Sequence, residues 1–219
     1  MTTVTTTPST GPLPAPADAT LALPSGEARV TASPPSIPGA TVLAMGLILA
    51  ADLMLLGTLL AAFFTLKGGA ASWPPRGVKL DIYLPMVVTI TAAMSAVSMG
   101  WAVFAVRRHD VGNAIAAMVL TIVFGLAMAN LQWYSMVKAP FGVARHSYGT
   151  MYDLLLNYHL VHILIGIVMI VVVGCRTLAG HFGRERLEPV RAVAMFWQYG
   201  NVAWALIVVV LFFMSKAHA

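Results

Sequence analysis

Five long apolar stretches constrain the fold of this chain more than any other feature. Each is long enough to cross a hydrocarbon layer of roughly 30 Å at about 1.5 Å per helical residue. Each is also too long and too uniformly apolar for a strand of a membrane barrel. The sequence therefore predicts an all-α fold, an integral membrane bundle of five transmembrane helices. The stretches are Thr41–Leu66, Ile82–Val106, Val111–Val137, Tyr152–Leu178 and Ala192–Met214.

The composition agrees with a membrane protein. Apolar residues make up 59% of the 219 residues, charged residues only 10%, and the mean hydropathy is +0.83. The net charge of +5 comes from basic residues spread over the N-terminal part and the loops, so it indicates membrane edges and no nucleic-acid partner. Residues 1–40 hold eight of the 13 prolines and eight threonines, which predicts a disordered tail followed by a membrane domain over 41–219.

Basic residues in the loops give the expected orientation. The two sides of the membrane differ by a single basic residue, seven against six. The Arg107-Arg108 pair in a very short turn and the four arginines around the fourth connection favour the side that holds the tail. We therefore expect the N-terminus in the cytoplasm.

Two histidines, His159 and His162, lie three residues apart inside the fourth stretch. Ionisable groups at membrane depth are costly and mark a functional or assembly surface. Haem ligation is one candidate role, but residues at i and i+3 share one helix face and cannot bind opposite faces of one haem. No other stretch contains a histidine, and 11 of the 13 methionines are spread over the five stretches, where methionine mostly fills packing gaps. We expect both rings to hydrogen-bond neighbouring helices, and no haem or metal in this chain.

Asp52 is the acid placed most clearly at mid-depth. It lies 11 residues into the first stretch, about 16 Å from the membrane edge, and His162 lies about 15 Å from the opposite edge. One interpretation is a hydrogen-bonded or protonated carboxyl that satisfies the backbone of a kinked helix. The other is a pair with His162 or His159, which lowers the cost of burying both groups.

Tryptophans and prolines mark two further features. Trp73, Pro74 and Pro75 follow the first stretch and indicate either a rigid interfacial turn or a docking surface. Trp197 and Trp204 lie seven residues apart on one face of the fifth stretch, where they serve as belt residues, packing residues or a partner interface. None of these residues is a typical catalytic group.

Four motifs in this order resemble the subunit III family of haem-copper terminal oxidases, in a short five-helix form. The family has a buried-glutamate helix of the type SE-x-x-FF that ends near AAYF and precedes WPP, where this chain has Ala51–Leu56, Ala61–Phe64 and Trp73–Pro75. A family stretch YGS followed by TGFHGLHVIIG is similar to Tyr148-Gly149-Thr150 followed by Leu156 to Gly166. The family's closing motif WHFVDxVW keeps its spacing in the stretch from Trp197 to Trp204.

The departures from the family motifs exchange charge for neutral polarity. The family's glutamate is shortened to Asp52, the histidine and aspartate of the last motif are Gln198 and Asn201, and a glutamate near the end of the third helix is Gln132. Hydrogen bonding between helices survives such exchanges, whereas charge-dependent proton uptake does not. We predict that Gln198 and Asn201 face the bundle or a lipid cleft.

The resemblance implies a role and a set of partners. It implies a non-catalytic membrane subunit of an aerobic respiratory terminal oxidase in the bacterial inner membrane, packed against the catalytic subunit I, which carries the haem and copper, and against other oxidase subunits. It also implies phospholipid bound between the helices, and support of complex stability and of proton and oxygen delivery. An accessory subunit of a nitric oxide reductase fits the same motifs. A free-standing carrier is a third reading, although the sequence has no internal repeat.

Overall fold

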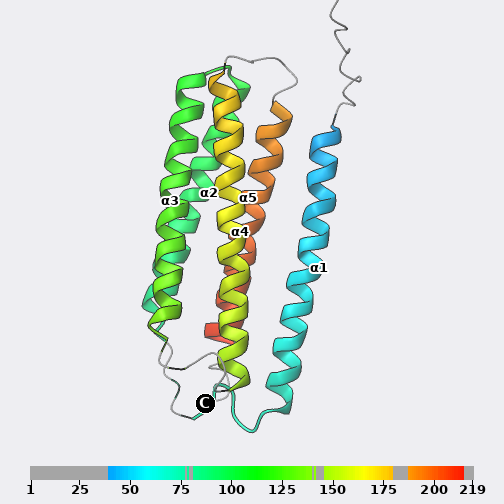
Figure 1. Cartoon of the computed structure of the whole chain (residues 1–219), viewed down its shortest axis with the longest axis vertical. Coiled ribbons are helices and arrows are strands. Elements are labelled where there is room, and N and C mark those ends of the chain that lie inside the picture. Colours follow the sequence, from blue (N-terminus) through cyan, green and yellow to red (C-terminus); the bar gives the residue numbers. More distant parts are fainter. Residues whose placement is uncertain are drawn as a thin grey trace, which may run out of the picture. The chain divides into compact units, whose positions relative to one another are not determined.

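A computed structural model of the protein describes residues 39–76, 78, 81–139, 141, 146–179 and 187–214. These residues form five long α-helices, and the last continues into a short π-helical segment (Figure 1). The elements are α1 (Ala40–Gly69), α2 (Tyr83–Arg107), α3 (Val111–Val137), α4 (Ser147–Leu178), α5 (Leu187–Val208) and η2 (Val209–Phe213). All five helices, with η2 counted as part of the last, are long and apolar enough to cross a membrane. The predicted all-α bundle is confirmed.

Two helices begin earlier than their apolar stretches. α4 begins at Ser147 and α5 at Leu187, each five residues before the predicted start. The first turn of α4 is mostly polar, and His146 Nδ1 accepts the Gly149 amide there at 2.9 Å. The first turn of α5 contains Glu188 and Pro189, and the acid suits the N-terminal end of a helix. Hydropathy predicts only the part of a helix inside the hydrocarbon, so it misses such turns. Residues 1–38 of the predicted tail lie outside the described residues.

α5 lies at the centre of the bundle. It packs against α1, α2 and α4, while α3 packs against α2 and α4. α5 with η2 is the most buried of the five spans and α1 the least. Figure 1 shows α1 at one side of the bundle, next to α4 and α5.

One tryptophan of α5 is packed where two glycines make room for it. A Cβ built at Gly125 of α3 would lie 2.7 Å from the ring of Trp197, and one built at Gly166 of α4 would lie 2.8 Å from it. The indole Nε1 donates to Ser95 Oγ of α2 at 3.1 Å. Trp197 therefore contacts α2, α3 and α4 at once and joins these helices to α5.

Polar contacts attach α1 near both of its ends. The amide of Gly39 donates to Glu188 Oε1 at 2.6 Å, and the ammonium of Lys67 donates to the carbonyl oxygen of Met214 at 2.7 Å. A third polar contact, at Asp52, lies between them. α1 is thus held by a few polar contacts rather than by a wide packed face.

The tight packing around Trp197 generates a stability prediction. We expect Gly166→Ala to lower the free energy of unfolding in detergent by about 1–3 kcal/mol, because the added methyl overpacks the site. Gly57→Ala on α1 is the matched control, since a Cβ there meets no atom within 4 Å. The control should change stability by no more than about 1 kcal/mol, in the stabilising direction. Equal stability of the two variants would contradict the close packing.

Candidate functional site

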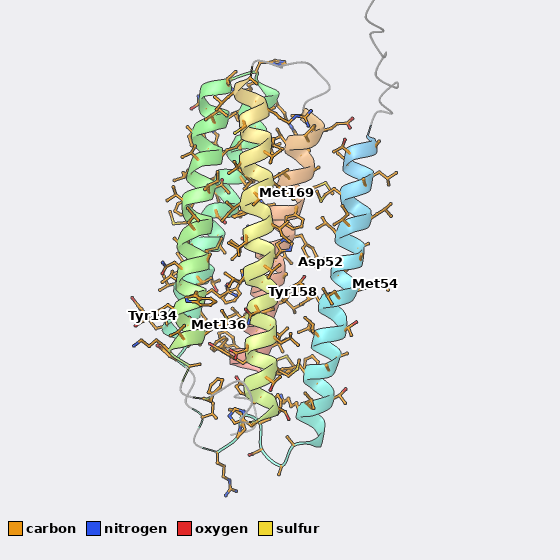
Figure 2. All side chains as sticks on the ribbon, viewed as in Figure 1. Asp52, Met54, Tyr134, Met136, Tyr158 and Met169 are labelled. Carbon is orange, nitrogen blue, oxygen red and sulfur yellow. The ribbon has the colours of Figure 1, made fainter. Side chains whose placement is uncertain are left out.

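A cluster of polar side chains joins α1, α4 and α5 near the middle of the membrane span. Asp52 comes from α1, Tyr158 and His162 from α4, and Tyr199 from α5. Tyr158 donates its hydroxyl hydrogen to Asp52 Oδ2 at 2.9 Å, and its oxygen lies 3.3 Å from that of Tyr199. Figure 2 shows Asp52 and Tyr158 at similar heights along the facing helices. The side chain of Asp52 is 20% exposed and that of His162 only 6%.

The contacts of His162 determine where one proton of the cluster lies. Its Nε2 is 3.0 Å from the carbonyl oxygen of Phe196, and its Nδ1 is 3.3 Å from Asp52 Oδ2. A carbonyl oxygen only accepts, so Nε2 carries a hydrogen and Nδ1 of a neutral ring is an acceptor. Asp52 and His162 therefore hold one further proton between them, on the carboxyl or on Nδ1. The pair has no net charge with the proton in either place, which suits its low-dielectric surroundings.

His162 is also fixed by packing. Its ring stacks on Phe196 with the centroids 3.9 Å apart. A Cβ built at Gly200 of α5 would lie 2.5 Å from the ring carbon Cδ2, so the absence of a side chain at Gly200 allows this approach. Both ring nitrogens of His162 thus have polar partners, and one face of its ring is covered.

His159 makes a separate set of contacts. Its Nδ1 lies 2.9 Å from Gln132 Oε1, and Gln132 Nε2 donates to the carbonyl oxygen of Leu156 at 2.6 Å. The ring stacks on Trp204 at a centroid distance of 4.7 Å. The sequence left either histidine as a possible partner of Asp52. In the structure Asp52 contacts His162, and His159 contacts Gln132 of α3 instead. Residues at i and i+3 are about 60° apart around a helix, which directs the two rings to different neighbours.

The amides of α5 form polar contacts with α2. Gln198 Nε2 donates to the carbonyl oxygen of Ala96 at 2.8 Å, and Asn201 Nδ2 donates to Gln198 Oε1 at 3.4 Å. Ser95 Oγ lies 3.5 Å from Asn201 Oδ1. Both amides are half-buried and face the bundle.

Trp197 and Trp204 are packing residues of the bundle. Each is less than 5% exposed, so neither forms a membrane belt or an accessible partner surface on this chain. Trp204 Nε1 donates to Thr89 Oγ1 of α2 at 3.0 Å. Together with the amides, they give α5 a row of polar contacts to α2.

The Trp73–Pro75 loop packs onto the ends of α1 and α4. The ring of Trp73 lies 5.2 Å from those of Phe63 and Tyr148, both at edge-to-face angles. The hydroxyl of Tyr148 donates to the carbonyl oxygen of Leu211 at 3.2 Å. Trp73 is half-buried, together with Pro74 and Pro75, so the loop is a packed turn.

Sequence reasoning missed Tyr158 and Tyr199. Both hydroxyl groups belong to the Asp52 cluster, yet tyrosine in an apolar stretch is usually read as a packing or interface residue. A signal was present in the motifs: each tyrosine stands where the quoted family motif has phenylalanine. Ser95 and Thr89 were missed as well, because a single hydroxyl in an apolar stretch carries little information.

The fold and the site together define a multi-pass membrane protein whose mid-membrane polar groups bind one another between helices. The sequence model of the cytochrome c oxidase subunit III family matches residues 37–216. The chain belongs to this family, as its motifs indicated. The matched residues include all five helices and every residue of the cluster.

Individual relatives are distant in sequence. Cytochrome c oxidase subunit 3 of Arabidopsis thaliana is 28% identical over 142 residues, which are 64% of this chain and 54% of that protein. The protein of the same name from Scyliorhinus canicula is 30% identical over 146 residues, 66% of this chain and 56% of its own length. That of Thermostichus vulcanus is 22% identical over 180 residues, 82% of this chain and 90% of that protein. The chain spans little more than half of the first two relatives. These matches do not favour the nitric oxide reductase alternative.

The contact between Asp52 and His162 predicts energetic coupling. Asp52→Ala and His162→Ala should each lower complex stability by about 1–3 kcal/mol, because each leaves a buried polar partner unsatisfied. The double variant should cost less than the sum by about 0.5 kcal/mol or more. Thermal unfolding in detergent measures the stability of each variant in this double-mutant cycle. Asp52→Ala combined with Thr177→Ala, which lies far along α4, is the control pair and should be additive. Strict additivity of the first pair would rule the contact out.

The neutral contacts of α5 predict a dependence on pH at Asn201. In Asn201→Asp the amide that donates to Gln198 Oε1 is lost, and an ionised carboxylate would face that oxygen instead. We expect this variant to destabilise assembly increasingly as the pH rises and the introduced carboxyl ionises, with Asn201→Ser mild at every pH. The yield of assembled protein between roughly pH 6 and 9 measures this pH-dependent loss of assembly. A wild-type yield of Asn201→Asp over that range would show that the site tolerates charge.

Proposed function

We propose that this chain is a non-catalytic membrane subunit of an aerobic respiratory terminal oxidase of the cytochrome c oxidase type. The family match over residues 37–216 carries the proposal, because it covers the whole bundle and its polar cluster. The subunit supports the stability of the complex and the delivery of protons and oxygen to the catalytic subunit. Haem and copper belong to that partner, subunit I, and not to this chain.

The contacts inside the bundle support a role in stability. The polar groups of the fourth and fifth helices bind neighbouring helices: His159 of α4 contacts Gln132 of α3, and Gln198 of α5 donates to the backbone of α2. These contacts join α4 to α3 and α5 to α2. A subunit of this kind contributes a rigid surface to its partners.

The cluster at Asp52 supports a narrower proton role than the family motifs imply. Asp52 and His162 hold one proton between them and can exchange it over 3.3 Å. Gln132, Gln198 and Asn201 cannot carry protons where the family motifs have ionisable groups. Within the described helices, the proposed proton role therefore centres on the Asp52 cluster, and stability is the main contribution of this chain.

The charge distribution supports a bacterial inner-membrane protein with a cytoplasmic N-terminus and bound phospholipid. α1, α3 and α5 begin at one end of the bundle, and α2 and α4 end there, so Arg107, Arg108, Arg176 and Arg191 lie at that end. Cytoplasmic membrane edges carry an excess of arginine and lysine. The grooves between the helices provide apolar surface for lipid chains.

Co-purification tests the proposed function. The chain, tagged and expressed in cells that contain its partner subunits, should be isolated in mild detergent together with a catalytic subunit and a haem absorption band. Gly166→Leu, which overpacks the Trp197 site, should lower the yield of the haem-containing complex, whereas Gly57→Ala should not. A stable, colourless homo-oligomer would contradict the proposal and support the carrier alternative.

A further inference from the structure

A cavity lies between α1 and α4 where Asp52 meets its partners. Its volume is about 650 Å³, within the usual range of small-molecule sites. Residues of α1 and α4 line it, together with Phe196 of α5. In Figure 2, Asp52 and Tyr158 lie at similar heights on the two helices, and Met169 lies above them on α4. Asp52 is thus a wall residue of the cavity as well as a bridge between helices.

The walls of this cavity are apolar apart from one polar region. Aliphatic side chains such as those of Ile48, Leu55 and Ile165 form most of the surface. Asp52 supplies the only carboxyl group among the described lining residues, and its side chain is 20% exposed. A ligand that enters the cavity therefore meets a hydrocarbon surface and one acid.

Aromatic rings line the cavity next to the acid. Tyr158 donates its hydroxyl hydrogen to Asp52, and Phe196 stacks on the ring of His162. The faces of aromatic rings attract organic cations, and aromatic cages bind quaternary ammonium groups. A carboxyl group beside aromatic rings in an apolar cavity is therefore complementary to a cation that carries hydrocarbon substituents.

The proton shared by Asp52 and His162 determines which charge the cavity accepts. With that proton the pair is neutral, so an added ion would leave an uncompensated charge in apolar surroundings. A cation avoids this cost by taking the place of the proton, because Asp52 is then ionised beside it and His162 is neutral. An anion would instead require a second proton on the pair, with the positive charge on His162, which is only 6% exposed. The more exposed member of the pair is the acid, and this favours a cation.

The other groups around Asp52 leave it as the partner of such a cation. Among the described residues, the ionisable groups that face this carboxyl are His162 and Tyr158 of α4 and Tyr199 of α5. Lys67, the other charged residue of α1, lies about 22 Å further along the helix. Small inorganic cations need about six oxygen ligands, more than the side chains around this cavity offer. An organic cation fits the apolar walls better.

We propose that this cavity binds a lipophilic organic monocation, such as a hydrophobic amine in its charged form, with its nitrogen at Asp52 and its hydrocarbon part along α1 and α4. Binding releases the proton that Asp52 and His162 share. The O–H or N–H bond of the pair breaks, and one proton passes to water for each cation bound. The site lies within this chain, so it goes beyond the proposed function and does not depend on the partner subunits.

Two probes of the same shape test the role of the charge. The full chain, purified with its accompanying subunits in an uncharged detergent, is titrated with phenylbutyltrimethylammonium and with the uncharged isostere in which carbon replaces nitrogen. The cation should bind at least about tenfold more tightly than the isostere. Its affinity should rise by up to about tenfold per pH unit between roughly pH 6 and 8, because one proton is released. Calorimetry in buffers of different ionisation enthalpy counts that proton.

Matched variants separate the carboxylate from the cavity. Asp52→Asn should abolish both the preference for the cation and the proton release, while Asp52→Glu should keep both. Asp153→Asn, which removes an acid of α4 outside the cavity lining, should bind as the wild type does. Ile48→Trp narrows the cavity and should weaken both probes, whereas Ile90→Trp on the exposed face of α2 should not. Variants are compared only after their thermal unfolding matches the wild type, and the two-probe comparison on the wild type decides if Asp52→Asn does not fold.

Four outcomes would overturn the proposal. Equal affinity of the two probes would show that the cavity accepts any apolar chain without regard to charge. An affinity for the cation that does not change with pH would show that no proton is exchanged. An unchanged preference in Asp52→Asn would place the cation elsewhere. Displacement of the cation by an equal concentration of sodium or potassium chloride would identify a site for an inorganic ion.

Discussion

The bundle depends on one constraint, that a polar side chain inside a hydrocarbon layer must find its partner within the protein. Many of the polar contacts that satisfy this constraint are made by α5. Its tryptophans and amides bind hydroxyl and carbonyl oxygens of α2, and its backbone accepts from His162 of α4. Small residues at the crossings, Gly125, Gly166 and Gly200, allow the rings to come close enough. Without these contacts the central helix would carry its polar groups into lipid.

The exchanges of charge for neutral polarity follow the same constraint. Gln132, Gln198 and Asn201 occupy positions where the family motifs have ionisable groups, and here each makes a hydrogen bond to a neighbouring group. Asp52 is the carboxylate that remains, and it is shorter than the glutamate of the motif. The hydroxyl of Tyr158 on the facing helix lies 2.9 Å from Asp52 Oδ2. Because the family motif has phenylalanine at this position, the added hydroxyl group compensates for the shorter side chain of the acid.

The sequence predicted the spans and the level of the site, but not all of its contacts. Helices have a regular rise, so residue counts alone placed Asp52 and His162 at matching depth. The rotation of each helix about its axis depends on side-chain packing between helices, and that determined which histidine meets Asp52. For the same reason the contact of His159 with Gln132 and the hydroxyl groups of Tyr158 and Tyr199 were not predicted. Hydropathy missed the first turns of α4 and α5 because each contains polar or charged residues outside the continuous apolar stretch.

The attachment of α1 at the edge of the bundle has a consequence for biosynthesis. α1 packs against α4 and α5, which are made later than α1, and Asp52 is separated by 106 residues from Tyr158. At about 5–20 residues per second, the ribosome needs roughly 5–20 s to make that intervening chain. Throughout this interval Asp52 enters the membrane without Tyr158 or His162. The order of synthesis thus requires α1 to wait in the membrane until α4 and α5 have been made.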